Sequence, residues 1–476
     1  MLEPQKHPNE TAYKSVIYDY LTRASVNYMV IDHLPNHTLE EIASLVGIAE
    51  HALLRVVFLQ DAQGSLMVIL PEDYFLDIGL LCASLGRELQ PISIDKLGKL
   101  FDENQISDYP PLPEFVEIPA VIEKDILNQE DIYFKPGVND TLVCMKRDVF
   151  MKFQKTTQCI NFSIPITHLS HLKNPEGGVS VKVKQLTPLR IKQRVTQTIE
   201  LPAVPLMASM ILKLRFDPHA TVGNLAEIIE KDPSLSAQLM SWALSPYYAY
   251  SGKINSLEGA IIKVLGFDLV MNLALTIVLG KAMRVPVEGP MGLREYWRFA
   301  LCCAAVVETL VNLMPTEKRP IPGLAYLAGL LHNFGHLLLA QVFPPHFELL
   351  NRYALTNPKV NLRLIEHYVL GVGHDEIGAW LLEAWELPPE VIAAVKFHHQ
   401  EEYESEYAVY SNLVLVATRL LRRHHIGDAE ETTLPPKLLA FLGLQEEEAL
   451  QALDYVMGQR EDLNILAGQL LEPQPK

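Results

Sequence analysis

The sequence has few cysteines, and none of them is spaced as a disulfide framework or a thiolate metal site would require. Its five cysteines are scattered, no CxxC spacing occurs, and the adjacent Cys302 and Cys303 fall in a helical pattern. Secreted scaffolds and structural zinc sites depend on paired or regularly spaced cysteines. We therefore expect reduced, buried thiols in a cytoplasmic protein.

Basic residues are outnumbered by acidic ones. The chain has 40 Lys and Arg against 57 Asp and Glu, which gives a formal net charge of −17. Because this charge repels phosphate overall, it excludes a dedicated nucleic-acid-binding protein of the basic type. The argument leaves room for a local basic patch, since residues 155–197 hold seven Lys and Arg and one acidic residue.

Long apolar runs and a secretory signal are also missing. The longest uncharged apolar run near the middle, Leu269–Gly280, is too short to span a bilayer and contains Asn272. The first residues, MLEPQKHPNE, lack the apolar core of a signal peptide. With 49% hydrophobic and 20% charged residues in a chain of 476, we expect a soluble protein of two or three domains that does not associate with a membrane.

The pattern of apolar residues divides the chain into four parts. Residues 1–153 mix helix and strand signals without the regular alternation of a Rossmann fold, which predicts a mixed α/β domain. Residues 154–197 are predicted to be a basic linker. Residues 198–425 show helical spacing almost throughout and predict an all-α domain, followed by a helical tail over 426–476.

Several local signals place elements within the first part. The runs LLRVVFL and SLMVILP flank the turn Asp61–Gly64 and predict a hairpin. Thr38–Glu41 reads as a capping box that opens a helix through Leu45, and a second helix is predicted from about 75 to 85, ending at Gly86. Further strands are predicted at YMVID and near 118–122, 132–134 and 141–145.

Capping signals likewise mark the helical part. Thr221, Ser256 and Asp232–Pro233 each stand immediately before an apolar periodic run, as residues that begin helices do. Two more helices are predicted in the tail between Leu438 and Leu471. Long apolar helices are predicted over 296–313, 322–342, 361–370, 374–385, 389–399 and 407–424.

The first part resembles the YbaK and prolyl-tRNA-synthetase editing-domain family. The matching runs are HTLEEIASLVGI, LLRVVFLQD, LMVILPEDYFLDIGLLCASLG and PAVIEKDILNQEDIYFKPGVNDTLVCM, which occur in the family's order. The resemblance implies hydrolysis of amino acids wrongly attached to tRNA, with aminoacyl-tRNA as a partner. It also implies a lysine in the first strand after the capped helix, where this sequence has Arg55.

Two departures from that family bear on activity. Arginine is planar and never deprotonates, so Arg55 is not a conservative replacement at a tight site. The family's glycine-rich loop is replaced by Ser107–Pro113, whose prolines lack the N–H donors that an oxyanion needs. The sequence therefore leaves open a deacylase that uses Arg55 and a domain that only binds a ligand.

The helical part resembles the HD-related output domain, HDOD. The motifs are LPAVP at 201–205, then DPHATVGNLAEIIEKDPSLSAQLMSWALS, then INSLEGAIIKVLG. The resemblance implies the fold of the metal-dependent HD phosphohydrolases and a role as an output module in bacterial signalling proteins, often without a demonstrated reaction. An HD site needs imidazoles and carboxylates that converge on a divalent metal.

The implied metal site is incomplete. The candidate ligands are His332, His374, His398 and His399. Three expected ligand positions hold other residues, namely Phe299, Asn333 and Thr418. Without both carboxylates, a hard cation such as magnesium has weak support, so we expect no cofactor, with zinc or another metal that accepts imidazole ligands as the alternative.

Three functions follow from these observations. The leading hypothesis is a bacterial regulatory protein with a non-catalytic HDOD domain that contacts an unidentified protein partner of a signalling pathway. The alternatives are a trans-editing aminoacyl-tRNA deacylase and a metal-dependent phosphohydrolase. The sequence does not fix the oligomeric state or the ligand of the first domain.

Overall fold

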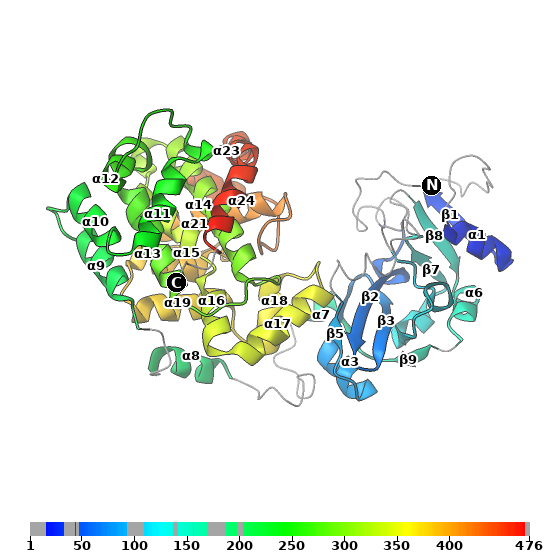
Figure 1. The fold of residues 1–476 in the computed structure, drawn as a ribbon. Helices are drawn as coiled ribbons and strands as arrows, with labels where there is room; N and C mark the ends of the chain where they lie inside the picture. Colours follow the sequence, from blue (N-terminus) through cyan, green and yellow to red (C-terminus); the bar gives the residue numbers. More distant parts are fainter. Residues whose placement is uncertain are drawn as a thin grey trace. The chain divides into compact units, whose positions relative to one another are not determined.

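The chain forms two compact units, which we call the sheet unit and the helical unit (Figure 1). The structure is a computed structural model, and it describes residues 16–32, 43, 47–92, 109–136, 141–155, 157–169, 187–197 and 203–471. The sheet unit comprises Met1–Val183 together with Arg352–Val360. The helical unit comprises Lys184–Asn351 and Asn361–Lys476.

The sheet unit is built on a mixed sheet. Its strands lie in the order β1-β8-β7-β2-β3-β6-β9, and β5 pairs with β2. The pairs β2–β3, β1–β8 and β7–β8 are antiparallel, whereas β2–β7, β3–β6 and β6–β9 are parallel. This arrangement confirms the predicted mixed α/β fold. The strands are β1 Met29–Asp32, β2 Leu53–Asp61, β3 Gly64–Pro71, β5 Gln90–Pro91, β6 Ala120–Glu123, β7 Asp131–Phe134, β8 Thr141–Lys146 and β9 Gln158–Ile160.

The hairpin β2–β3 forms at the predicted turn. Asp61 pairs with Gly64 in the register, and the Asp61 carboxylate accepts a hydrogen bond from the backbone N–H of Gln63. Arg87 binds the same carboxylate through two nitrogens, at 2.7 and 2.8 Å, and holds the pKa of Asp61 down at about 2. Local side-chain bonds thus fix the turn and, through it, the register of the two central strands.

The helix predicted from about 75 to 85 begins later than expected. Tyr74–Leu76 forms strand β4, which pairs with β10 (Ser163–Pro165), and helix α3 covers Ile78–Leu85. Asp77 is the N-cap of α3 and accepts the N–H of Leu80. Gly86 ends the helix at φ 64°, as predicted. The helix begins after Asp77 because its carboxylate accepts the N–H of Leu80, one of the N–H groups in the first turn that have no partner within the helix.

Packing against the sheet completes the first unit. Helix α1 (Val16–Arg23) buries Ile17 and Leu21 in the same core as Phe58 and Met67 of the hairpin. The described end of the predicted proline-rich loop is buried at Pro110–Pro113, where Pro113 begins the short helix α5 (Pro113–Val116). The smaller helices are η1 Glu50–Ala52, η3 Lys124–Asn128, α6 Arg147–Phe150, η4 Met151–Phe153 and α7 Ile166–Leu169.

Some sequence predictions fall outside the described residues. These are most of the capped helix at 38–45, the first two residues of the loop at 107–113, and residues 156 and 170–186 of the basic linker. The described parts of the predicted basic linker are divided between the units. Strands β9 and β10 belong to the sheet unit, whereas helix α8 (Pro188–Gln197) belongs to the helical unit.

The helical unit is a bundle, as predicted (Figure 1). The predicted caps form: Thr221 accepts the N–H of Asn224, Ser256 accepts that of Gly259, and Asp232 accepts two N–H groups ahead of Pro233. The helices are α9 Leu206–Arg215, α10 Val222–Ile229, α11 Pro233–Ala243, η5 Pro246–Tyr248, α12 Leu257–Ala260, η6 Ile261–Leu265, α13 Phe267–Lys281, α14 Leu293–Leu313, η7 Thr316–Lys318, α15 Pro322–Leu331, α16 Phe334–Val342, α17 Pro344–Thr356, α18 Leu362–Leu370, α19 His374–Ala384, α20 Pro389–Phe397, α21 Ala408–Arg422, α22 Pro436–Leu442, α23 Glu446–Gly458 and α24 Arg460–Gln469.

Two predictions for this unit need correction. The tail has three helices, because Gly443 adopts φ 74° and separates α22 from α23. The predicted helix over 322–342 is interrupted at His332 and Asn333, which separate α15 from α16. Leu293–Leu313 and Pro322–Val342 are long and apolar enough to cross a membrane, yet most of the first and all of the second are buried in the unit. Core packing accounts for that composition.

Candidate functional site

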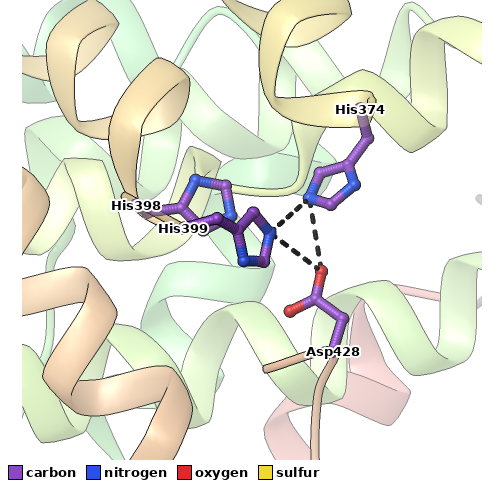
Figure 2. A group of neighbouring side chains, drawn as sticks. All are labelled: His374, His398, His399 and Asp428. Atoms are coloured by element: carbon purple, nitrogen blue, oxygen red, sulfur yellow. Dashed lines mark hydrogen bonds and ion pairs between the residues drawn. The ribbon is translucent and has the colours of Figure 1, made fainter. Parts of the chain in front are cut away.

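Three helix ends and one loop bring a group of buried side chains together in the helical unit (Figure 2). His332 is the C-cap of α15, His374 is the first residue of α19, and His398 and His399 follow the last residue of α20. Asp428 comes from the loop between α21 and α22. The structure therefore brings all four predicted histidines to one place and adds a carboxylate that the sequence analysis did not identify.

Two glycines allow the helices that carry this group to approach closely. A Cβ on Gly335 in α16 would lie 2.0 Å from the carbonyl oxygen of His374, and one on Gly378 in α19 would lie 3.1 Å from the nitrogen of Gly335. Any larger residue at 335 would push α16 away from the start of α19. The local sequence thus fixes where His374 stands.

His332 and His398 are oriented in the same way. Nδ1 of His332 lies 2.7 Å from the carbonyl oxygen of Gly329, and Nδ1 of His398 lies 2.7 Å from that of Val395. A carbonyl only accepts, so each Nδ1 carries the proton and each Nε2 keeps a free lone pair. Both Nε2 atoms are buried without a hydrogen-bond partner among the described residues.

Burial keeps these two imidazoles neutral. Burial first, and neighbouring histidines second, lower the pKa of His332 to about 3 and that of His398 to about 4. The pKa of His399 is also well below its usual value, first because of burial and then because of His398. Neutral imidazoles with free lone pairs are the form of histidine that binds metals.

Glu366 of α18 orients His374. One oxygen accepts from the backbone N–H of His374 and lies 2.8 Å from its Nδ1, and the other lies 2.7 Å from Nε2 of His336. Burial opposes the charged imidazole, but Glu366, together with Asp428 and Asp375, outweighs it and raises the pKa of His374 to about 9. A metal ion bound at Nε2 would displace the proton from that nitrogen. The contact turns Nε2 of His374 toward Asp428, which is the carboxylate–histidine arrangement seen behind metal ligands.

Asp428 lies opposite the imidazoles. Its Oδ2 is 3.2 Å from Nε2 of His374, 3.8 Å from Nε2 of His399 and 3.3 Å from Nδ2 of Asn333. Its Oδ1 is buried without a hydrogen-bond partner among the described residues. The nearby histidines outweigh burial and lower the pKa of Asp428, so the carboxylate is charged.

Phe299, Asn333 and Thr418, which stand where the HD pattern expects metal ligands, each make a different contact in the structure. The ring of Phe299 packs edge-on against His332, with centroids 4.6 Å apart. Asn333 donates to Asp428, and Thr418 donates to Leu415 within its own helix. The expectation that only imidazoles are available is therefore corrected, because Asp428 supplies a carboxylate from a loop.

The only sequence signal near Asp428 is the preceding glycine, Gly427, which indicates a turn. Gly427 adopts φ 89°, and a Cβ there would lie 2.2 Å from the ring of Phe299. Gly-Asp after the predicted helix over 407–424 is a turn signal, but no spacing relates it to the histidines. By contrast, Asp375 and Glu376 lie in the first turn of α19.

The group has the dimensions of a site for one zinc-type ion. One atom each from His374, His398, His399 and Asp428 can be chosen so that all four lie within 4.8 Å of one another. Bonds of about 2.0–2.1 Å from a tetrahedral zinc place its ligand atoms about 3.4 Å apart. The Nε2 atoms of His374 and His399 are 3.4 Å apart, and His374 is 3.2 Å from Asp428. The Nε2 of His398, which is buried without a hydrogen-bond partner among the described residues, agrees with such a fit.

Arg55 occupies a different kind of site, in the sheet unit. Its guanidinium donates to the carbonyl oxygens of Thr356 and Tyr74, at 2.9 and 3.0 Å, and to Oδ1 of Asn357, at 3.0 Å. All three acceptors are neutral. Burial lowers the pKa of Arg55, which Glu72 partly offsets. The arginine expected to meet a substrate is therefore bonded to the protein's own chain.

Comparison with known proteins agrees with both resemblances. A family model described as "HDOD domain" matches residues 201–401, and one described as "Aminoacyl-tRNA editing domain" matches residues 33–153. The crystal structure of a candidate signal transduction protein from Marinobacter aquaeolei VT8 is 30% identical, with a TM-score of 0.76 over 97% of this chain and 100% of that chain. The chain belongs to the HDOD family. It carries an aminoacyl-tRNA editing domain ahead of the HDOD domain.

Two further relatives bear on the HDOD domain and on chain length. An HDOD domain protein from Geobacter sulfurreducens is 20% identical, with a TM-score of 0.50 over 60% of this chain and 97% of that chain, which shows the fold alone. An uncharacterized protein of Treponema pallidum (strain Nichols) is 24% identical over 270 residues. That match covers 54% of this chain and 51% of the relative, so the chain spans about half the length of the curated relative it matches.

Proposed function

We propose that this HDOD protein is a cytoplasmic regulator in a bacterial signalling pathway, and that its HDOD domain holds one structural metal ion of the zinc type. In this proposal the domain acts through a protein partner and performs no hydrolysis. The observation that carries it is the buried set of His374, His398, His399 and Asp428. The relationship to a candidate signal transduction protein supports the regulatory role.

The composition of the set favours a structural ion. A catalytic zinc site has three protein ligands and leaves a fourth position for water, whereas four protein ligands close a structural site. Here three imidazoles and one carboxylate fill the tetrahedron. Magnesium and manganese prefer mostly oxygen ligands, which this set does not provide. A bound ion would supply charge neutralisation and would tie the ends of α19 and α20 to the Asp428 loop.

Metal analysis of protein purified without a histidine tag tests this proposal. We expect about one zinc or cobalt ion per chain in the wild type, as a closed four-ligand site predicts. Asp428→Ala and His374→Ala should each lose the ion, whereas His219→Ala, which removes an exposed histidine, should keep it. Substoichiometric metal in the wild type, or equal metal content in Asp428→Ala, contradicts the proposal.

Phosphohydrolysis is tested on the same proteins. Phosphodiesters and cyclic nucleotides should not be turned over above background with zinc, manganese or magnesium added. Metal-dependent turnover that is lost in His332→Ala would mean that the site is hydrolytic. That outcome would replace the regulatory proposal with an enzymatic one.

A deacylase is the second candidate, because the editing-domain match covers residues 33–153 and a cationic Arg55 stands in the first long strand. The bonds of Arg55 to Thr356, Tyr74 and Asn357 rank it below the first candidate. Incubating mischarged tRNAs with wild type and Arg55→Ala decides between them. We expect no difference from background in either protein, whereas hydrolysis by the wild type that Arg55→Ala abolishes would establish the deacylase.

A further inference from the structure

The segment Arg352–Val360, which we call the strap, is a part of the sheet unit that comes from far along the chain. It follows the predicted editing domain by some two hundred residues of sequence and contains the C-terminal end of α17. We propose that the strap is a built-in ligand of Arg55 that couples the editing-domain site to the loop carrying Asp428. The coupling rests in part on the proposed function, since Asp428 is the anionic member of the proposed metal-binding residues His374, His398, His399 and Asp428, which we call the metal set.

The strap is held by side chains along its length. The hydroxyl of Tyr353 donates to Oδ1 of Asp77 at 2.7 Å, and its ring stacks on Phe75 with centroids 5.3 Å apart. Arg352 donates to the carbonyl oxygen of Leu89 at 2.7 Å. Because Asp77 is also the N-cap of α3, the strap bonds directly to the group that starts this helix.

Asn357 is the centre of the contact. Its Oδ1 accepts from the backbone N–H of Leu76 at 2.7 Å and from Arg55 at 3.0 Å, and its Nδ2 donates to the carbonyl oxygen of Leu76 at 3.0 Å. The side-chain amide thus pairs with both backbone groups of one residue, as a neighbouring strand would. Asn357 is 1% exposed, so removing it would leave buried polar groups of Leu76 and Arg55 without these partners.

A tight turn leads from the strap into the helical unit. The N–H of Val360 donates to the carbonyl oxygen of Asn357 at 3.0 Å, and Pro358 and Lys359 occupy the two central positions of this turn. Proline at the first central position pre-sets the turn geometry. Lys359 also forms an ion pair with Glu72, at 2.5 Å. Residues 357–360 therefore form a hydrogen-bonded turn within the sheet unit.

Asn361, the next residue, organises the metal set from within the helical unit. It is the N-cap of α18, where its Oδ1 accepts from the N–H groups of Arg363 and Leu364. Its Nδ2 donates to the backbone carbonyl of Asp428. Helix α18 also carries Glu366, which orients His374. One residue thus links the end of the strap to both Asp428 and Glu366.

The consequence is a coupling between Arg55 in the sheet unit and the Asp428 loop in the helical unit. In this proposal, Arg55 holds Thr356 and Asn357 and so orders the turn at 357–360, and this order extends along the chain to Asn361. Release of the strap frees Asn361 and so loosens the Asp428 loop and the start of α18. A change at the editing-domain site would reach the HDOD domain by this route.

Hydrogen–deuterium exchange on the full-length, metal-free protein tests the coupling. We expect Arg55→Ala and Asn357→Ala each to speed exchange at 352–360, and also at 361–366 and 426–430, by about tenfold or more, as the loss of buried hydrogen bonds with a charged partner predicts. Asp61→Asn is the control, because it breaks the Arg87 pair in the sheet unit without touching the strap. It should leave exchange at 361–366 and 426–430 unchanged.

The outcomes separate this inference from the proposed function. Faster exchange confined to the sheet unit in both variants overturns the coupling, whatever the metal content of the protein. If one variant fails to fold, the other decides, and Tyr353→Phe provides a milder third variant that removes the hydroxyl bonded to Asp77. Metal analysis of the wild type tests the ion separately, because exchange in the metal-free protein does not require it.

Discussion

Asp428 supplies from a loop the negative charge that helical positions 333 and 418 do not carry. Its approach depends on two neighbours, since Asn333 donates a hydrogen bond to it and Gly427 makes room beside Phe299. An aspartate at 333 would instead place two carboxylates within hydrogen-bonding distance, which is unfavourable without a cation between them. Asn333 and Asp428 are therefore compatible beside the histidines, because only one of the two carries a negative charge.

Replacing Glu366 by glutamine tests how His374 is held. The variant keeps the shape of the side chain but removes the charge that orients the imidazole. We expect zinc affinity to fall by about 10- to 100-fold, which is the usual effect of changing an outer carboxylate behind a metal-bound histidine. Competition with a chelator measures the affinity, and Glu383→Gln, at an exposed position of α19, should bind as the wild type does. Equal affinities in the two variants would contradict the assigned role of Glu366.

At the scale of elements, the site lies where helices end. Helices α15, α19 and α20 each present a histidine at a terminus, and the break between α15 and α16 places His332 and Asn333 together. Terminal residues are free of the regular helical pattern, so their side chains can converge from several directions. The loop after α21 completes the set.

Gly427→Ala tests the role of that loop. A Cβ at this position would lie 2.2 Å from the ring of Phe299, and the φ of 89° is unfavourable for alanine. We expect a loss of about 1–3 kcal/mol in the free energy of unfolding, together with weaker zinc binding. Denaturant unfolding and chelator competition measure the two effects. Gly458→Ala in helix α23 meets no atom within 4 Å and should be neutral or stabilising by up to about 1 kcal/mol. A wild-type stability for Gly427→Ala would show that the loop adapts.

The sequence predicted some helices of the site closely and missed others, and the difference has a physical reason. The helices expected over 361–370, 374–385 and 389–399 form at 362–370, 374–384 and 389–397, because their apolar spacing and caps are local signals. Helix α17 was not predicted, since it begins at two prolines and its apolar residues are less regular. The interruption at His332–Asn333 gave no signal either, because the apolar pattern continues across it.

The site was predicted in part. Motif order located the four histidines and the three altered positions, but Asp428 depends on a loop conformation that no spacing encodes. The bonds between Arg55 and Asn357 join residues some three hundred positions apart, and such contacts are set by tertiary packing. A resemblance to a family identifies the position of Arg55 without revealing what fills its surroundings.

At the scale of the whole molecule, the two units are not separate along the chain. The sheet unit is completed by Arg352–Val360, whereas the sequence predicted a self-contained domain over residues 1–153. Arg55, Leu76 and Asp77 each bond to this segment. The sheet unit therefore takes part of its hydrogen bonding from a segment that lies far along the chain.

A fragment of residues 1–183 should accordingly be less stable than the same unit in the full chain. It would lack two of the three acceptors of Arg55, those of Thr356 and Asn357, and the Asn357 amide that bonds Leu76. Each unsatisfied buried polar group costs about 1–3 kcal/mol. We expect a low midpoint of thermal unfolding for the fragment, measured by far-ultraviolet circular dichroism. We also expect faster hydrogen exchange at β2 and β3 in the fragment than in the full chain. Adding a synthetic peptide of residues 350–361 should raise the midpoint, and an equal stability without the peptide would contradict the account.

The central claim is that the HDOD domain holds one ion in a closed set of protein ligands. Anomalous X-ray scattering at the zinc edge, from a crystal of protein purified without a histidine tag, tests it most directly. The account predicts one peak about 2.0–2.2 Å from atoms of His374, His398, His399 and Asp428, with no coordinated water. Two metal peaks about 3.5–4 Å apart bridged by water, as hydrolytic two-metal sites show, or no peak at all, would contradict it.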